Sequence, residues 1–202
     1  MKATIINKIE AAKVVAIIRT DNTNAVRPAI TTLVEAGITA LEITSNTPDF
    51  AAHITWARNT FPEILVGAGT IINPTLAQEA IQAQAQFLVT PNMNVEVIKA
   101  AQNSDIVTLM GAMTPTDIAT GIEHGADFIK IFPAAPLGIE YFKALLGPFK
   151  GTKFIAVGGV RTANAAEWFA AGAVGIGVGG AFVEGPADAM KENIRKLFEQ
   201  IK

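Results

Sequence analysis

The feature that most constrains this chain is a regular alternation between short apolar runs and longer amphipathic segments. The runs are rich in β-branched residues and lack polar alternation, which is typical of parallel strands covered on both faces. Half of the residues are hydrophobic and only 17% are charged, so many elements can be buried in one core. Eight strands are expected, at residues 14–19, 38–44, 64–69, 86–90, 105–110, 127–132, 153–157 and 174–178.

The segments between these runs predict helices. They lie at residues 24–35, 48–59, 74–83, 94–102, 115–123, 139–146, 163–171 and 186–201, with an extra N-terminal helix at 4–12. Three of them are expected to begin with a polar cap before a proline, at Thr47, Asn73 and Thr114. Three are expected to end at a glycine in the left-handed conformation, at Gly37, Gly125 and Gly172.

Strands that alternate with helices predict βαβ units and a parallel sheet. Eight units in 202 residues allow about 25 residues each, near the lower limit for a (β/α)8 TIM barrel. The alternative is a doubly wound open sheet, which usually carries a glycine fingerprint after an early strand. The first such junction, residues 19–23, has no glycine, so the α/β class with a (β/α)8 barrel is favoured. No linker divides the chain, and we expect one domain over residues 1–202.

Composition narrows the function. The net charge of −2, with no block of like charges, argues against a nucleic-acid partner. No apolar run approaches the length of a membrane span, and the polar N-terminus carries no export signal, so a cytoplasmic protein is expected. With no cysteine there is no thiol nucleophile, and no metal-ligand spacing occurs. The two histidines, His53 and His124, are expected at the surface, and metal-free chemistry without a cofactor is predicted.

Two charged residues interrupt the strand interiors. Lys130 lies between Ile129 and Ile131, and Glu42 lies in the second strand. Strand alternation places both on the face opposite their apolar neighbours, so both are expected in the barrel lumen. A structural ion pair is one interpretation. The other is a catalytic pair, in which an amine with a pKa lowered by burial forms a Schiff base and the carboxylate moves protons.

Anion-binding groups are expected at the carboxyl ends of the strands. Arg19 ends the first strand. One interpretation is a solvated side chain at a strand end, and the other is a guanidinium that binds a carboxylate or phosphate through two N–H groups. Thr70 offers a hydroxyl at the same rim. Glycines follow the last two strands, where barrels of this kind often bind phosphate, at Gly158, Gly159, Gly179 and Gly180.

In its motifs, the chain from Val14 to Lys202 resembles the KDPG/KHG aldolases (2-dehydro-3-deoxyphosphogluconate and 4-hydroxy-2-oxoglutarate aldolases). The motifs are VVAIIR, ALEIT, VGAGT, FLVTP, MTPTD, GADFIKIFPA and GIGVGGAFV, in this order. The resemblance implies a homotrimeric barrel and class I aldol chemistry. It matches Lys130 with the Schiff-base lysine and Glu42 with the acid/base glutamate. It also matches the pyruvate pocket with Arg19, Thr70, Pro91 and Phe132, and the phosphate end with the four glycines.

The chain departs from this family at three places. Many members carry T-L-R-T-P where this chain has TSNTP, so Asn46 stands in place of an arginine. Gly180 stands in place of a serine that ends the eighth strand, and Met110-Gly111 replaces the usual P-G. The TPN and FIAVGGV stretches look more like the phosphogalactonate branch.

The expected reaction is reversible cleavage of 2-keto-3-deoxy-6-phosphogluconate to pyruvate and glyceraldehyde 3-phosphate, with 4-hydroxy-2-oxoglutarate as a further substrate. The partners are then pyruvate and a phosphorylated keto acid. Three alternatives remain: a 2-dehydro-3-deoxy-6-phosphogalactonate aldolase, a sugar-phosphate-binding barrel that forms no imine, and a trimeric scaffold with lapsed catalysis.

Overall fold

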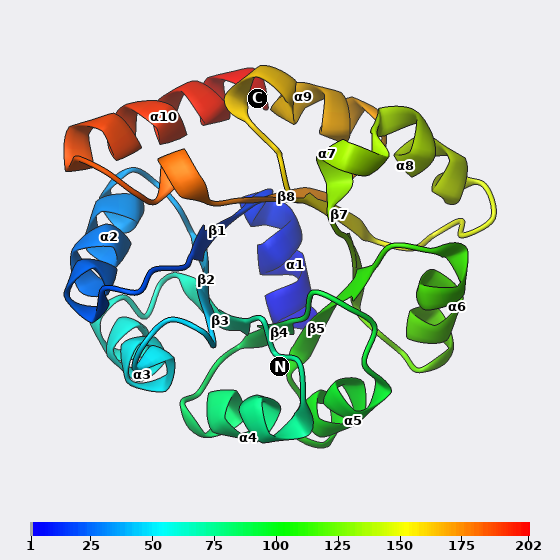
Figure 1. The fold of residues 1–202 in the computed structure, drawn as a ribbon, viewed down its shortest axis with the longest axis horizontal. Helices are drawn as coiled ribbons and strands as arrows, with labels where there is room; N and C mark the ends of the chain where they lie inside the picture. Colours follow the sequence, from blue (N-terminus) through cyan, green and yellow to red (C-terminus); the bar gives the residue numbers. More distant parts are fainter. Residues whose placement is uncertain (1) are drawn as a thin grey trace.

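Eight parallel strands form a closed barrel in sequence order in the computed structural model, which describes residues 2–202 (Figure 1). The strands are β1 (Val14–Ile18), β2 (Ala40–Thr44), β3 (Leu65–Gly69), β4 (Phe87–Val89), β5 (Val107–Ala112), β6 (Phe128–Ile131), β7 (Phe154–Val157) and β8 (Gly175–Val178). Pairing of β8 with β1 closes the sheet. The predicted (β/α)8 barrel is confirmed, and the open sheet is excluded.

Helices surround the barrel on its outside (Figure 1). They are α2 (Thr23–Glu35), α3 (Phe50–Thr60), α4 (Pro74–Gln82), α5 (Val95–Asn103), α6 (Pro115–Glu123), α7 (Ala134–Leu137), α8 (Ile139–Leu146), α9 (Thr162–Ala170) and α10 (Ala187–Gln200). A 3-10 turn, η1 (Gly180–Phe182), joins β8 to α10, and the short α7 after β6 was not expected. In the described part of the chain, no helix is both long and apolar enough to cross a membrane.

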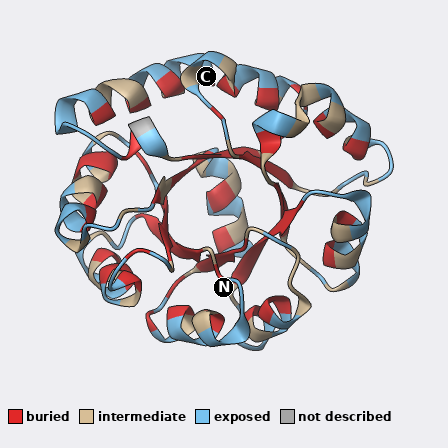
Figure 2. Cartoon of the chain, viewed as in Figure 1, coloured by how far each residue is buried: buried red, intermediate tan, exposed pale blue. Residues whose placement is uncertain are grey.

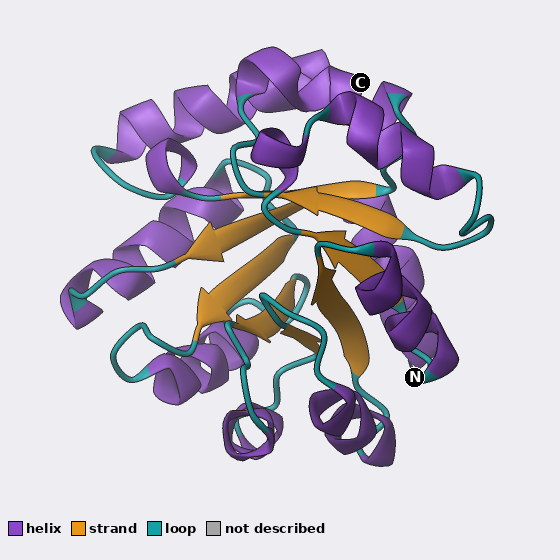
Figure 3. Ribbon diagram, turned by 45° about the vertical axis from the view of Figure 1, so that its right-hand side comes forward, coloured by secondary structure: helices purple, strands orange, loops and turns teal. Residues whose placement is uncertain are grey.

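Side chains of each strand alternate between two apolar layers. One layer packs between the strands and the outer helices, and includes Leu41, Ile43, Ile129 and Ile131. The other fills the barrel lumen, and includes Leu65 and other large side chains. Figure 2 shows the barrel strands as an almost continuous buried ring, and Figure 3 shows the strands enclosed by helices. This alternation is what turns Glu42 and Lys130 inward.

The extra N-terminal helix, α1 (Lys2–Ala12), lies across the N-terminal end of the barrel. Ile5 and Ile9 of this helix pack against the lumen layer at the N-terminal ends of the strands. Ion pairs join this helix to the strand beginnings, with 3.0 Å between Lys2 Nζ and an oxygen of Asp127. Because α1 fills this end, the lumen opens toward the carboxyl ends of the strands.

Helix ends follow the local rules with one exception. Asn73 and Thr114 cap α4 and α6 as predicted, and the three predicted stop glycines, Gly37, Gly125 and Gly172, have positive φ angles. The prediction for Thr47 was wrong: α3 begins at Phe50, with Asp49 as its N-cap. The Thr47 side chain is instead 1% exposed, and its hydroxyl contacts Ile18 O at 3.5 Å and Thr44 Oγ1 at 3.1 Å.

The surface position predicted for His53 was also wrong. Its side chain is only 5% exposed, and its Nε2 lies 2.9 Å from Thr23 Oγ1. Thr23 also donates a hydrogen bond to Asp49, so His53 belongs to a contact between the beginnings of α2 and α3. The partner comes from another helix, which is why local sequence did not reveal it. His124 lies at the end of α6 and is half-buried.

Candidate active site

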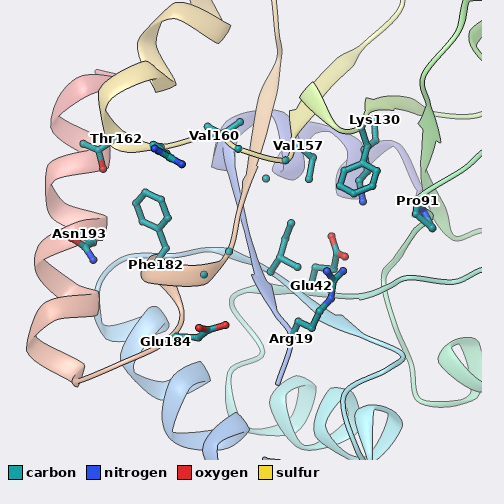
Figure 4. A pocket seen from close by; sticks show the side chains of 18 of the residues that line it. Arg19, Glu42, Pro91, Lys130, Val157, Val160, Thr162, Phe182, Glu184 and Asn193 are labelled. Carbon is teal, nitrogen blue, oxygen red and sulfur yellow. The ribbon is translucent and has the colours of Figure 1, made fainter. Parts of the chain in front are cut away.

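A cavity of about 740 Å³ opens at the carboxyl ends of the strands (Figure 4). All ten residues selected from the sequence line this one cavity, although they come from seven different strands or strand ends. They are Arg19, Glu42, Thr70, Pro91, Lys130, Phe132, Gly158, Gly159, Gly179 and Gly180. The structure thus brings the predicted residues together, while the role of each stays a prediction.

Glu42 and Lys130 are the buried charges of this cavity. Glu42 is 2% exposed and Lys130 is 5% exposed. In the register of the barrel, Gly67 is the β3 neighbour of Glu42, and Gly111 is the β5 neighbour of Lys130. A Cβ at Gly67 would clash with the Phe87 ring, and one at Gly111 would clash with the Pro91 backbone, so glycine at both positions allows close packing next to the two charged groups.

Burial shifts both groups toward their neutral forms. Loss of water raises the pKa of the Glu42 carboxyl, although the positive charges of Lys130 and Arg19 oppose this rise. Loss of water also lowers the pKa of the Lys130 amine, opposed by Glu42 and assisted by Arg19. An amine with a lowered pKa beside a carboxyl with a raised pKa suits imine formation followed by proton transfer.

Arg19 and Thr70 form a polar pair at the rim. The Arg19 guanidinium donates a hydrogen bond of 3.2 Å to Thr70 Oγ1. Arg19 is exposed, yet its charge acts on both Glu42 and Lys130, so it lies close to them. A cation and a hydroxyl beside a buried amine are suited to hold an anionic group such as a carboxylate.

Phe132 and Pro91 complete the wall around the amine. Lys130 Nζ lies 5.0 Å from the centroid of the Phe132 ring. Pro91 approaches from the β4 end, where its backbone packs so closely on Gly111 that a Cβ would not fit. The Met110-Gly111 departure therefore keeps the glycine that this packing needs.

The four glycines lie at the other end of the cavity. Gly158, Gly159 and Gly180 all have positive φ angles, which explains the use of glycine there. The first turn of α9 also borders this end, with Thr162 as the first helical residue. Exposed backbone N–H groups at a helix N-terminus are suited to an anion such as phosphate.

Five further polar or aromatic residues line this end and were not found from the sequence. They are Arg161, Thr162, Phe182, Glu184 and Asn193 (Figure 4 labels all but Arg161). Arg161 follows the glycine pair after β7, a position that could have indicated it. Glu184 and Asn193 come from the segment after η1 and from α10, and no local pattern marks them.

The described residues offer no metal centre: within residues 2–202, no three His, Asp or Glu side chains are placed to hold a metal ion together. The groups that converge on the cavity are instead an amine, a carboxyl, a guanidinium and backbone amides.

The sequence profile of the KDPG and KHG aldolases matches residues 5–199. The KHG/KDPG aldolase of Escherichia coli (strain K12) is 33% identical over 165 residues, which cover 81% of this chain and 76% of that protein. The 2-dehydro-3-deoxy-6-phosphogalactonate aldolase of the same organism is 35% identical over 149 residues, 73% of each chain.

Solved structures agree with these matches. A structure described as native KDPGal superposes with a TM-score of 0.88 at 29% identity and covers 93% of both chains. The KDPG aldolase of Legionella pneumophila, with pyruvate captured as a covalent carbinolamine, superposes with a TM-score of 0.82 at 29% identity. It covers 100% of this chain and 96% of that one. The chain therefore belongs to the KDPG and KHG aldolase family, whose members are metal-independent class I lyases that cleave carbon–carbon bonds through a Schiff base.

Proposed function

We propose that this protein reversibly cleaves 2-keto-3-deoxy-6-phosphogluconate to pyruvate and glyceraldehyde 3-phosphate, with Lys130 as the Schiff-base residue. The single observation that carries this proposal is the burial of one lysine and one glutamate in the same cavity, beside an arginine and a hydroxyl. Two buried charges cost more in desolvation than their attraction usually returns, so their retention indicates a role in catalysis.

The reaction begins at the C2 carbonyl. The free amine of Lys130 attacks this carbon to form a carbinolamine, and loss of water gives a protonated imine. Arg19 and Thr70 hold the C1 carboxylate during this step. Glu42 is suited to transfer the protons, because burial raises the pKa of its carboxyl and so makes it a stronger proton acceptor than an exposed glutamate.

Cleavage then breaks the C3–C4 bond. Glu42 takes the proton of the C4 hydroxyl, directly or through a water molecule. The electrons of the broken bond move into the protonated imine and form an enamine, while C4 leaves as an aldehyde. Protonation of the enamine at C3 and hydrolysis of the imine release pyruvate and regenerate the Lys130 amine.

The aldehyde fragment extends toward the glycine end of the cavity. There the N–H groups of the α9 N-terminus and the side chain of Arg161 would hold its phosphate. In the relative from Legionella pneumophila, pyruvate is held as a covalent carbinolamine, which supports the same first step here. The smaller 4-hydroxy-2-oxoglutarate, a substrate of the KHG/KDPG relatives by their name, would fit the same pyruvate half.

A second candidate substrate is 2-dehydro-3-deoxy-6-phosphogalactonate, which differs in stereochemistry at C4. The 35% identity to the phosphogalactonate aldolase supports it, as do the TPN stretch at Thr90–Asn92 and the FIAVGGV stretch at Phe154–Val160. A panel of both phosphorylated acids and 4-hydroxy-2-oxoglutarate, coupled to pyruvate detection, separates these substrates by kcat/KM. Absence of pyruvate release from all three would favour a scaffold without catalysis.

Borohydride reduction in the presence of pyruvate tests the mechanism. We expect a carboxyethyl adduct on the peptide that contains Lys130, found by mass spectrometry. Lys130→Met should abolish trapping, whereas Lys153→Met, at the opposite end of the barrel, should retain it. An unmodified Lys130 peptide, under conditions that trap a known class I aldolase, would remove the Schiff base and leave a barrel that forms no imine.

We further propose a homotrimer in the cytoplasm. A designed cage built by fusing symmetric oligomeric domains superposes on this chain with a TM-score of 0.88 at 29% identity, which supports a symmetric oligomer. Ile72 and Met113 are exposed apolar side chains that an interface could cover. Light scattering measures the mass directly, and a monomer at working concentration would contradict this assembly.

A further inference from the structure

Ser45 lies directly after β2, between the two strands that supply Glu42 and Thr70. Its N–H donates to Gly69 O at 2.8 Å and so extends the pairing of β2 with β3 by one bond. Its hydroxyl donates to Thr70 O, also at 2.8 Å. Ser45 is half-buried and does not line the cavity, so it acts on the site only through another residue.

Thr70 has an unfavourable backbone conformation that its neighbours must maintain. Its φ angle is +57°, in the left-handed region that a β-branched residue rarely adopts. The peptide that follows is held at both ends, because Ser45 binds the Thr70 oxygen and the N–H of Ile71 donates to Val89 O at 3.1 Å. Such conformations are unfavourable and persist only where surrounding contacts fix them.

This conformation presents the Thr70 hydroxyl to Arg19, whose guanidinium donates to it at 3.2 Å. Asn46, which follows Ser45, is uncharged and does not line the cavity. The grip on the substrate carboxylate therefore depends on Arg19 and Thr70, and on whatever keeps these two side chains aligned.

We propose that Ser45 is a positioning residue for the 2-keto acid: its hydroxyl holds Thr70 in the left-handed conformation that keeps the Thr70 hydroxyl against Arg19. Ser45 thereby sets the affinity for the carboxylate of pyruvate and of the intact substrate. This inference rests on the proposed function. Because the carboxylate is held equally before and during bond cleavage, loss of the hydroxyl should weaken binding more than it slows chemistry.

The experiment measures the pyruvate concentration that gives half-maximal borohydride trapping at Lys130, together with KM and kcat for cleavage. Removal of one hydrogen bond in Ser45→Ala should raise both the half-saturating concentration and KM about threefold to tenfold. The kcat should stay within about twofold of the wild type. Ser45→Thr should restore the wild-type values, and Ser104→Ala, at the only other serine of the chain, should not change them.

A double-mutant cycle separates positioning from a general structural role. In a Thr70→Val background the hydroxyl that faces Arg19 is absent, so Ser45→Ala should change the half-saturating concentration less than about twofold. If Ser45→Ala does not fold, the pair Ser45→Thr and Ser45→Val replaces it, because these two differ only in the hydroxyl and a methyl group.

The outcomes are distinct. Equal half-saturating concentrations in Ser45→Ala and the wild type would overturn the role of Ser45 and leave the aldolase mechanism intact. A fall in kcat with unchanged KM would also overturn the role of Ser45. So would a rise in the half-saturating concentration that is as large in the Thr70→Val background as in the wild type. Failure of the wild-type protein to be trapped at Lys130 would instead overturn the proposed function itself.

Discussion

The carboxylate of Glu42 lies in the space beside Gly69 that the Cβ of any other residue would fill. The two residues are on adjacent strands, β2 and β3, and both face the lumen. Gly69, the second glycine of the VGAGT motif, is therefore part of the site, because it leaves room for the buried carboxylate. The flexibility of its backbone is not what this position requires.

Gly69→Ala should consequently displace Glu42 and impair catalysis. The methyl group cannot coexist with the carboxylate in its present position, and we expect overpacking to cost about 1–3 kcal/mol of folding free energy. Turnover should fall more than the affinity for pyruvate, because Glu42 moves protons and does not hold the carboxylate. Gly147→Ala is the matched control, since nothing lies within 4 Å of a Cβ there. Unchanged kcat in Gly69→Ala would show that Glu42 is not needed in this position.

Glu42→Gln should shift the titration of Lys130 to lower pH. The negative charge of Glu42 raises the pKa of Lys130, against the lowering by burial. Removal of that charge therefore lowers the Lys130 pKa further, and the free amine persists to more acidic pH. In a plot of the trapping rate against pH, the fall on the acidic side should move to lower pH. Turnover should fall by about 10²–10⁴-fold, because the proton carrier is lost. A move of the acidic-side fall to higher pH would show that Glu42 does not act on the amine.

Sequence alone predicted the elements with strong local patterns. Eight apolar runs yielded eight strands, and the alternation around Glu42 and Lys130 placed both in the lumen, because a two-residue period leaves only two choices of face. Contacts between elements that are far apart in the sequence could not be predicted, because they leave no local pattern. Thr47 and His53 are buried by partners from other elements. The glycine end of the cavity is lined partly by Asn193 of α10, which lies at the opposite end of the chain from β1.

His53 should make the stability of the protein depend on pH. Burial and the nearby charge of Arg27 lower its pKa below 6.5, while Asp49 opposes this shift. The folded protein then binds a proton less readily than the unfolded chain, so stability is full above pH 6.5 and falls as the pH drops through the folded-state pKa. Urea unfolding at several pH values measures this loss. His53→Gln should reduce the pH dependence; the same slope in this variant and in the wild type would exclude His53 as its source.

Glu184 should weaken binding of a phosphorylated aldehyde fragment. Its carboxylate lines the same end of the cavity as Arg161 and the N-terminus of α9, with the sign of charge opposite to theirs. Glu184→Gln removes a repulsion of about 1 kcal/mol, so kcat/KM for a phosphorylated substrate should rise about threefold to tenfold. The gain should shrink as salt is added, because Glu184 is exposed. The half-saturating pyruvate concentration should not change, since pyruvate carries no phosphate. Glu63→Gln makes the same charge change at the opposite end of the barrel and should leave kcat/KM unaltered; an equal rise in both variants would mean that net charge alone, and not the position of Glu184, governs the preference.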